Sequence, residues 1–400
     1  MGIIDPRLIN RRQLIASSVG GGLAIALTNE RDPGRQQSAL AQGDSANVPT
    51  YRGNSARTGE MPGPGPNHAN GLEILWQFTA SKGQVGAPAV VDGVVYLPSS
   101  GQGNGLYALD ALNGTELWRL GDDSGSSTPV VQDGVVYVGI WRSIYALNAQ
   151  DGTQRWRYQL ANGSSPLAVV ENVVYGTGWG TAYAVSADDG SELWRFATEN
   201  DQEMSPPVVV DNTVYVAGGD NRLNALNAED GTKRWEYLYG ETSLAPAVSN
   251  GVIYIGEDGI LRAVDVEDLT ERWTVATPYF DDWFSSAAVV DDAVYVSAIG
   301  DQGTLLALNT DDGTERWRFA EEHIFSSPVV ADGVVYINSG GTIVAVNAID
   351  GIEQWRYTLP GSDSRYDNDP FEGGSLVVVN GIVYAGGSPG GTLYAIGAPR

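Results

Sequence analysis

The chain has 400 residues, of which 42% are hydrophobic and 51 are glycine, so it can bury a substantial core and form many turns. Its 49 acidic and 23 basic residues give a formal net charge of −26, which repels nucleic acid and anionic lipid and disfavours both as partners. Cysteine is absent, which excludes disulfides, thiolate zinc sites and a lipid-bearing cysteine.

The first 41 residues are predicted to be an export signal. Arg11 and Arg12 precede a mostly apolar run, Leu14 to Thr28, which is too short to span a bilayer but suits the core of a signal peptide. The paired arginines resemble a twin-arginine signal, which carries folded proteins across bacterial or archaeal membranes. "ALA" at 39–41 is the expected cleavage site, although the charges of "NERDPGR" before it are atypical and a retained N-terminal anchor is the alternative.

We therefore expect an exported protein that is periplasmic, bound in the cell envelope or secreted. The mature chain is expected to have no transmembrane span and to be a monomer. Residues 42–70, which include the Pro/Gly-rich "MPGPGPNHANG", are predicted to be a leader or linker before the first regular strand.

From residue 71 onward the sequence repeats. A tryptophan returns in one context, as in "NAQDGTQRW" and "NTDDGTERW", at intervals of 38 to 44 residues: Trp76, Trp118, Trp156, Trp194, Trp235, Trp273, Trp317 and Trp355. A period of about 40 residues is typical of a propeller blade or a solenoid unit.

Each unit reads as four antiparallel strands. A short apolar run, a two-residue turn such as Asp-Gly, Glu-Asn or Asn-Gly, and a β-branched run with a tyrosine predict a hairpin. A third strand such as "SIYALNA", a second Asp-Gly turn and the tryptophan strand follow. The predicted fold is therefore all-β, a β-propeller over residues 71–397 with four-stranded antiparallel blades.

The two ends of the repeat predict how many blades there are and how the ring closes. The last unit stops at its third strand, "TLYAIGAPR", whereas the first tryptophan strand, "GLEILWQF" at 71–78, has no strands before it. We expect this N-terminal strand to complete the last blade, which gives eight blades and a ring without a free edge. The repeated tryptophans are expected to lie across blade junctions rather than to bind a cofactor.

The repeats resemble those of pyrroloquinoline quinone (PQQ)-like eight-bladed propellers, and "YRGNSARTG" at 51–59 resembles the leader that such propellers carry. The family includes quinone-dependent alcohol dehydrogenases and non-enzymatic scaffolds such as BamB, so the resemblance implies the fold and leaves the function open. The dehydrogenases carry an adjacent cysteine pair over the quinone, and haem-bearing ones carry Cys-x-x-Cys-His. This chain contains neither, so the resemblance favours the non-enzymatic BamB-like branch.

The sequence offers little other chemistry. Two histidines, His68 and His323, are too few for a histidine metal cluster, and most acidic residues lie in repeated turns that explain them. We therefore expect no bound cofactor and no metal, and no catalytic residue is assigned. The alternative is a PQQ-dependent dehydrogenase that uses carboxylates such as Asp281 or Asp282, with calcium beside the quinone.

Residues that break the repeat point to a binding surface. They fall in the second-to-third turns of blades two, three and four and in the connections that precede blades six, seven and eight. All of these segments are expected on one face of the ring, called here the loop-bearing face. The candidate binding residues are Trp141, Arg142, Trp179, Asp220, Arg222, Asp281, Asp282, Trp283, Phe325 and Tyr366.

These aromatic residues predict a non-catalytic scaffold that binds a protein, a peptide or a glycan on the loop-bearing face. Two alternatives stay open. The long loops could fold inward and close their own channel with these aromatic side chains, or a partner within an envelope complex could bind the outer strands instead.

Overall fold

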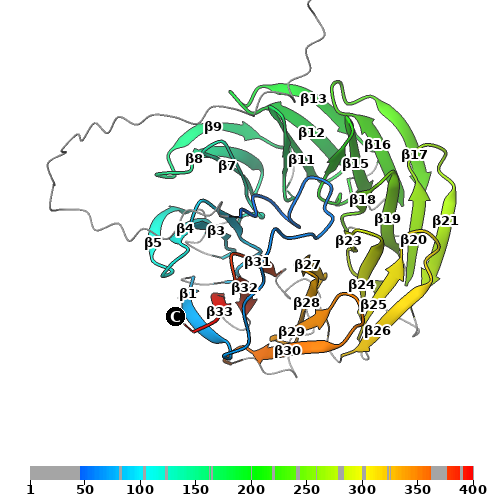
Figure 1. Cartoon of the computed structure of the whole chain (residues 1–400). Helices are drawn as coiled ribbons and strands as arrows, with labels where there is room; N and C mark the ends of the chain where they lie inside the picture. Colours follow the sequence, from blue (N-terminus) through cyan, green and yellow to red (C-terminus); the bar gives the residue numbers. More distant parts are fainter. Residues whose placement is uncertain are drawn as a thin grey trace, which may run out of the picture. The chain divides into compact units, whose positions relative to one another are not determined.

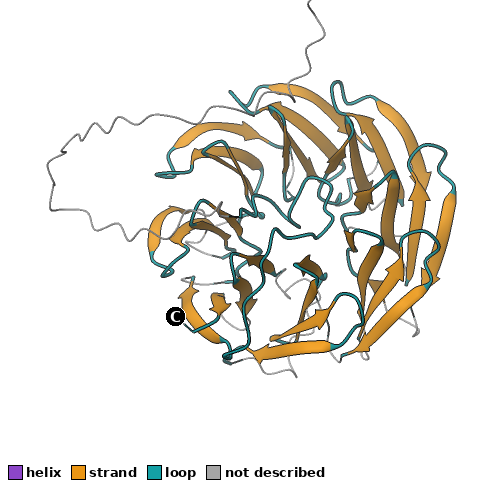
Figure 2. Ribbon diagram, viewed as in Figure 1, coloured by secondary structure: helices purple, strands orange, loops and turns teal. Residues whose placement is uncertain are grey.

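The computed structural model describes residues 46–399 except 81–82, 102–104, 122–124, 162, 164, 200, 219–220, 240–243, 258, 278–282, 300–302, 322–323, 325, 362–375 and 388–390. Every regular element in this part of the chain is a β-strand, and the strands form eight separate antiparallel sheets arranged as a ring (Figures 1 and 2). The predicted eight-bladed propeller is thus confirmed.

The sheets follow one another along the chain, and the strands of each are given from the axis outward. Blades one to four are β2 (Ala89–Val91), β3 (Val94–Pro98), β4 (Gly105–Asp110), β5 (Glu116–Gly121); β6 (Val130–Gln132), β7 (Val135–Ile140), β8 (Ser143–Asn148), β9 (Gln154–Gln159); β10 (Ala168–Val170), β11 (Val173–Gly178), β12 (Thr181–Ser186), β13 (Glu192–Ala197); β14 (Val208–Val210), β15 (Thr213–Gly218), β16 (Arg222–Asn227), β17 (Lys233–Leu238). Blades five to eight are β18 (Ala247–Ser249), β19 (Val252–Glu257), β20 (Ile260–Asp265), β21 (Glu271–Ala276); β23 (Ala288–Val290), β24 (Ala293–Ile299), β25 (Thr304–Asn309), β26 (Glu315–Ala320); β27 (Val329–Ala331), β28 (Val334–Ser339), β29 (Thr342–Asn347), β30 (Glu353–Thr358); β31 (Val377–Val379), β32 (Ile382–Gly387), β33 (Thr392–Gly397), β1 (Glu73–Thr79).

Two-residue turns join the first and second strands of each blade, as their residue types predict. Asp133 and Gly134 have φ of 50° and 72°, and Asn250 and Gly251 have φ of 50° and 73°. Two consecutive residues with positive φ are typical of the turn whose twist matches that of paired strands. The repeated Asx-Gly pairs therefore set the register of the inner hairpins that contain them.

The repeated tryptophans connect neighbouring blades. Trp194, which is 6% exposed, packs beside Tyr175 of its own blade, and its Nε1 donates to the Ala228 carbonyl oxygen of the next blade at 2.8 Å. The Tyr175 hydroxyl donates to the same oxygen at 3.3 Å. The same tryptophan-to-carbonyl bond recurs from Trp76 to Ala111, Trp118 to Ala149, Trp156 to Ala187, Trp273 to Thr310 and Trp317 to Ala348.

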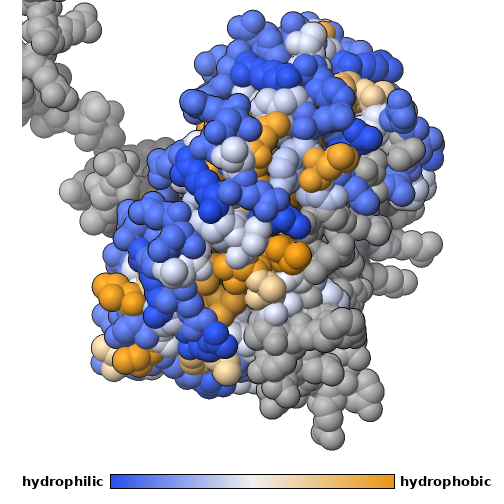
Figure 3. Space-filling view, turned by 90° about the vertical axis from the view of Figure 1, so that its right-hand side faces the viewer, coloured by the Kyte–Doolittle hydropathy of each residue, from blue (hydrophilic) through white to orange (hydrophobic). Residues whose placement is uncertain are grey.

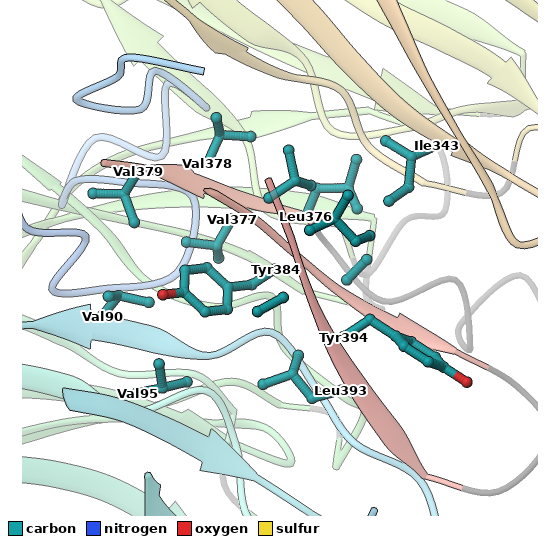
Figure 4. Close-up of a cluster of buried hydrophobic side chains, with 14 of the residues drawn as sticks. Val90, Val95, Ile343, Leu376, Val377, Val378, Val379, Tyr384, Leu393 and Tyr394 are labelled. Carbon is teal, nitrogen blue, oxygen red and sulfur yellow. The ribbon is translucent and has the colours of Figure 1, made fainter. Parts of the chain in front are cut away.

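Strand β1 closes the ring, as predicted. It pairs antiparallel with β33, so blade eight contains strands from both ends of the propeller sequence. Trp76 on β1 then bonds to Ala111 of blade one, which joins the last blade to the first. Figure 4 shows part of the apolar core there, with Val90 and Val95 of blade one facing Tyr384 and Leu393 of blade eight.

The outer strands present a polar surface. On β13 and β26 the burial alternates, with the tryptophan buried and the residues on either side of it exposed. Figure 3 shows the side of the ring that carries β17 and β21, where hydrophilic residues cover most of the surface and apolar residues form smaller areas. On β17, Leu238 is 66% exposed.

Residues 46–64, called here the channel segment, run through the centre of the ring (blue in Figure 1). Val48 exchanges two backbone hydrogen bonds with Val90 of blade one. Carbonyls of the segment also accept hydrogen bonds from innermost strands of blades two, four, five, six and seven: Pro49 from Val131, Ser55 from Val209, Ala56 from Val248, Thr58 from Val289 and Gly59 from Val330. These bonds tie one continuous segment to most of the ring.

Candidate functional site

The second-to-third turns and the connections between blades share one face of the ring. Short bridges pair a connection with the end of the second strand that it passes, as between Ser126 and Ile140 and between Met204 and Gly218. The described turns and connections at the loop-bearing face are therefore held by the ends of strands.

Trp141 forms the tip of the β7–β8 hairpin, next to Arg142. Its side chain is 57% exposed and its backbone has a φ of 49°. A left-handed backbone is uncommon for a bulky residue and is normally supplied by Gly, Asn or Asp. The Arg142 carbonyl accepts hydrogen bonds from the Leu160 backbone N–H at 2.7 Å and from Gln159 Nε2 at 2.8 Å, while its side chain is exposed.

Trp179 occupies the matching turn of blade three. It is 54% exposed, and its backbone bridges to Glu203 in the connection that leads to blade four. The next residue, Gly180, has a φ of 65° and donates to the Gln202 carbonyl at 2.6 Å. The left-handed residue is thus the second of this turn, Gly180, whereas in blade two it is the first, Trp141.

Trp283 belongs to an extra strand, β22 (Trp283–Phe284), at the edge of blade six. Trp283 pairs with Ile299 and Phe284 pairs with Ala298 of β24. Because side chains alternate along a strand, Phe284 is 1% exposed while Trp283 is 43% exposed. The short strand thus anchors an outward-facing tryptophan on a buried phenylalanine.

Arg222 differs from these aromatic residues. It is the first residue of β16, and its Nη1 donates to Glu236 Oε1 of the same blade at 2.5 Å. Hydrogen bonding from Lys233, followed by the charge of Arg222, holds the pKa of Glu236 below its usual range. The structure therefore places Arg222 in an ion pair within blade four. The remaining predicted binding residues lie outside the described residues: Asp220, Asp281, Asp282, Phe325 and Tyr366.

Two buried arginines of the channel segment were not singled out from the sequence. Arg52 is 2% exposed and Arg57 is fully buried, in a chain with 23 basic residues. The one sequence feature that could have indicated these arginines is their position in the leader that precedes the repeats. Both lie in "YRGNSARTG", the stretch that resembles the leader of PQQ-like propellers.

Quinone chemistry in this fold would need calcium and a set of oxygen ligands around it. Among the described residues, no three His, Cys, Asp or Glu side chains gather closely enough to hold a metal ion. Asp281 and Asp282, the carboxylates that the dehydrogenase alternative would use, lie outside the described residues, so no step is assigned to the quinone. The same part contains no helix that is long and apolar enough to cross a membrane.

A family model described as outer membrane protein assembly factor BamB matches residues 68–165, 142–299 and 257–398. The chain belongs to this family. The matched residues include strands from all eight blades, so the BamB family repeat accounts for the whole ring. None of the curated proteins compared with the sequence matches it.

Solved structures with this fold include both non-enzymatic and enzymatic proteins. BamB from Moraxella catarrhalis is 20% identical with a TM-score of 0.65, covering 82% of this chain and 98% of its own. A quinohemoprotein alcohol dehydrogenase from Pseudomonas putida HK5 is 15% identical with a TM-score of 0.67, covering 89% and 82%. The computationally designed Ika8 protein is 17% identical with a TM-score of 0.67, covering 81% and 99%. A designed protein and an enzyme match equally well, so these likenesses show the fold alone.

Proposed function

We propose that this protein is an exported, non-catalytic scaffold that binds a protein or peptide partner on its loop-bearing face. Membership of the BamB family supports a protein partner, since the family is described as an assembly factor for outer membrane proteins. The paired arginines at 11–12 support export. A net charge of −26 disfavours an acidic partner, so the partner is neutral or basic.

The single observation that carries the proposal is the backbone of Trp141. Blade seven places Gly340, with a φ of 51°, at the corresponding position, the first residue of a two-residue turn. A bulky residue in this conformation costs about 1–3 kcal/mol. The Trp141 side chain is 57% exposed, so little packing within the ring offsets that cost. A binding partner that contacts the indole would offset this cost and would account for a tryptophan at this position.

Trp179 and Trp283 extend this surface. Each is fixed through its backbone to a neighbouring connection or strand while its side chain stays 54% or 43% exposed. Rigid, exposed tryptophans are the residues that most often dominate the energy of protein interfaces. Their exposure also argues against the alternative in which these side chains fold inward to close the channel.

The test compares capture of partners from the native envelope fraction by tagged wild-type protein and by two variants, Trp141→Asn and Trp283→Ala. Asparagine tolerates a positive φ, so Trp141→Asn should lose the partner while the melting temperature stays at or above the wild-type value. The control, Leu238→Ala, removes an exposed apolar side chain from an outer strand and should keep the partner.

Unchanged capture by both tryptophan variants would contradict the proposal. Loss of the partner with Leu238→Ala instead would place the binding surface on the outer strands. Release of the partner by soluble oligosaccharide would show that the aromatic residues bind a glycan.

A PQQ-dependent dehydrogenase is the second candidate function. The fold likeness to the quinohemoprotein alcohol dehydrogenase favours it, and Asp281 and Asp282, outside the described residues, would be its carboxylates. Direct binding of PQQ decides between the two functions.

A further inference from the structure

Two exposed isoleucines lie in the outer turn of blade seven, between β29 and β30. Ile349 is 86% exposed and Ile352 is 64% exposed, and no other large apolar side chain of the described residues is as exposed as Ile349. The Ala348 backbone N–H donates to the Gly333 carbonyl of the inner turn at 2.9 Å, so the inner and outer turns of the blade share one face. This face lies opposite the loop-bearing face and is called here the turn-bearing face.

Ile352 replaces a hydroxyl residue that stabilises the same turn in other blades. In blade four the Thr232 hydroxyl donates to Asp230 Oδ1 at 2.7 Å, and a matching bond is present in each of blades two to six. The other four bonds run from Thr153 to Asp151, Ser191 to Asp189, Thr270 to Asp268 and Thr314 to Asp312. Isoleucine has no hydroxyl, so blade seven retains the bond from the Ile352 backbone N–H to Asp350 Oδ1, at 3.1 Å, and lacks the second one. The stability of the turn therefore does not explain an isoleucine at this position.

Ile349 also departs from the repeat. Carboxylates occupy the matching position in four consecutive blades, three to six, while blade two has glutamine there and blade one has leucine. These residues, all exposed, are Leu112, Gln150, Asp188, Glu229, Glu267 and Asp311. Asp350 lies between the two isoleucines in the turn, and Asp332 lies in the inner turn of the same blade. Ile349 and Ile352, called here the isoleucine patch, are thus bordered by carboxylates.

The charge around the isoleucine patch limits what binds there. A second copy of this chain would bring the same acidic turns together in a symmetric contact, and an anionic lipid surface would be repelled for the same reason. Lysine or arginine side chains of a partner would be attracted to the carboxylates, while its aliphatic side chains would cover the isoleucines. The complementary partner is therefore a protein segment that carries aliphatic and basic side chains side by side.

We propose that the isoleucine patch is a second docking surface, which binds a protein segment that combines aliphatic with basic side chains. The patch lies on the opposite face of the ring from Trp141, Trp179 and Trp283. The proposal therefore does not depend on the function proposed above, and a partner on each face would make the propeller a bridge between two proteins.

The first test measures the binding of labelled synthetic peptides by fluorescence anisotropy. One peptide alternates leucine with lysine, a second has serine in place of its leucines, and a third has glutamate in place of its lysines. The wild type should bind the leucine–lysine peptide about tenfold more tightly than either of the others, because that peptide alone offers both apolar contact and opposite charge. Equal affinities of the wild type for the leucine–lysine and serine–lysine peptides would overturn the proposal.

A double variant assigns this preference to the patch. Ile349→Gln with Ile352→Thr gives blade seven the residues that blade two has, Gln150 and Thr153. The variant should bind the leucine–lysine peptide no more tightly than the serine–lysine peptide. Its melting temperature should stay at or above that of the wild type, because the hydroxyl bond to Asp350 is restored. The control Leu238→Gln, which removes an exposed apolar side chain from β17, should keep the tenfold preference. A preference that survives in the double variant would overturn the proposal.

The second test, hydrogen exchange of the wild-type protein, needs no variant. The leucine–lysine peptide should slow the exchange of backbone amides in residues 348–353 and leave the matching turn of blade two, residues 149–154, unchanged. Equal slowing in both turns would mean that the peptide responds to charge alone, and slowing confined to the loop-bearing face would place it on the other side of the ring. Either result would overturn the proposal.

Discussion

The indole of Trp194 lies against the α-carbon of Gly231 in the next blade. A Cβ at Gly231 would come within 2.6 Å of Trp194 Cδ2, closer than real Cβ atoms approach other atoms. Equivalent contacts join Gly114 to Trp76, Gly190 to Trp156 and Gly313 to Trp273. The outer turn thus needs glycine for two reasons. The glycine backbone has a positive φ, and a side chain there would collide with the indole ring that packs against it.

Gly231→Ala should therefore destabilise the propeller. Its matched control is Gly134→Ala, since Gly134 has a φ of 72° against 70° for Gly231, but a methyl group at Gly134 would meet no atom within 4 Å. Both variants incur the strain of a left-handed alanine, and only Gly231→Ala adds a clash. Chemical unfolding should give a loss about 1–3 kcal/mol larger at Gly231 than at Gly134. Equal losses would mean that the indole moves aside freely.

Closure of the ring gives a second prediction. Trp76 is 7% exposed and donates to the Ala111 carbonyl at 2.9 Å, so Trp76→Ala should cost about 3–5 kcal/mol in the free energy of unfolding. Leu193→Ala, which truncates a side chain that is 51% exposed, is the control and should change little. Deletion of residues 71–78 should leave β33 as a free edge and cause aggregation in size-exclusion chromatography. A deletion variant that melts like the full chain would contradict this closure.

Stability should fall in alkaline solution. Burial raises the pKa of Tyr96 and Tyr254 to about 12, above the ordinary value of 10.0. The unfolded chain therefore releases these protons first, so the stability is fully present below about pH 10 and is lost as the pH rises towards 12. Melting temperatures between pH 9 and 12 should show this decline, and Tyr96→Phe should make it less steep. An unchanged slope in Tyr96→Phe would exclude this tyrosine as a contributor.

The acidic surface should make stability depend on salt. With a net charge of −26, like-charge repulsion opposes the compact state, and it is screened as the Debye length falls from about 10 Å at 0.1 M to about 3 Å at 1 M salt. The melting temperature should rise with potassium gluconate as well as with potassium chloride. A flat response to gluconate would mean that the surface charges are spaced too widely to repel one another strongly.

Quinone binding separates the two candidate functions. A scaffold given PQQ and calcium should release the quinone during gel filtration and should not reduce a dye with alcohols or sugars. Co-elution of one quinone per chain, together with turnover, would establish the dehydrogenase. Binding is the stronger criterion, because a lack of turnover with a few alcohols leaves other substrates untested.

The repeat made most of the fold predictable. The blades reuse the same Asx-Gly turns, tyrosine and tryptophan for the same contacts, so the period predicted the sheets, and the incomplete units at both ends predicted the closure through β1. The path of the channel segment was not predicted, because its bonds to Val131, Val209 and Val289 use backbone atoms that any sequence could supply.

The candidate site was only partly predictable, because a side chain's partner on another strand cannot be read from the sequence. Trp141 and Trp179 stood out because they replace the usual turn residues, and Trp283 because it lies in a connection that breaks the repeat. All three side chains are exposed in the structure. Arg222 could not be separated from them by sequence, since its partner Glu236 lies 14 residues away on the neighbouring strand.

The path of the channel segment also bears on how the chain can be made. Ala46 donates to Asn380, 334 residues away, and Val48 bonds to the first blade. The channel segment is synthesised before the blades, but part of its partners exist only when the last blade has been made. Contacts so far apart in sequence give a high contact order, which slows folding. Completion of the ring therefore has to wait for the last blade.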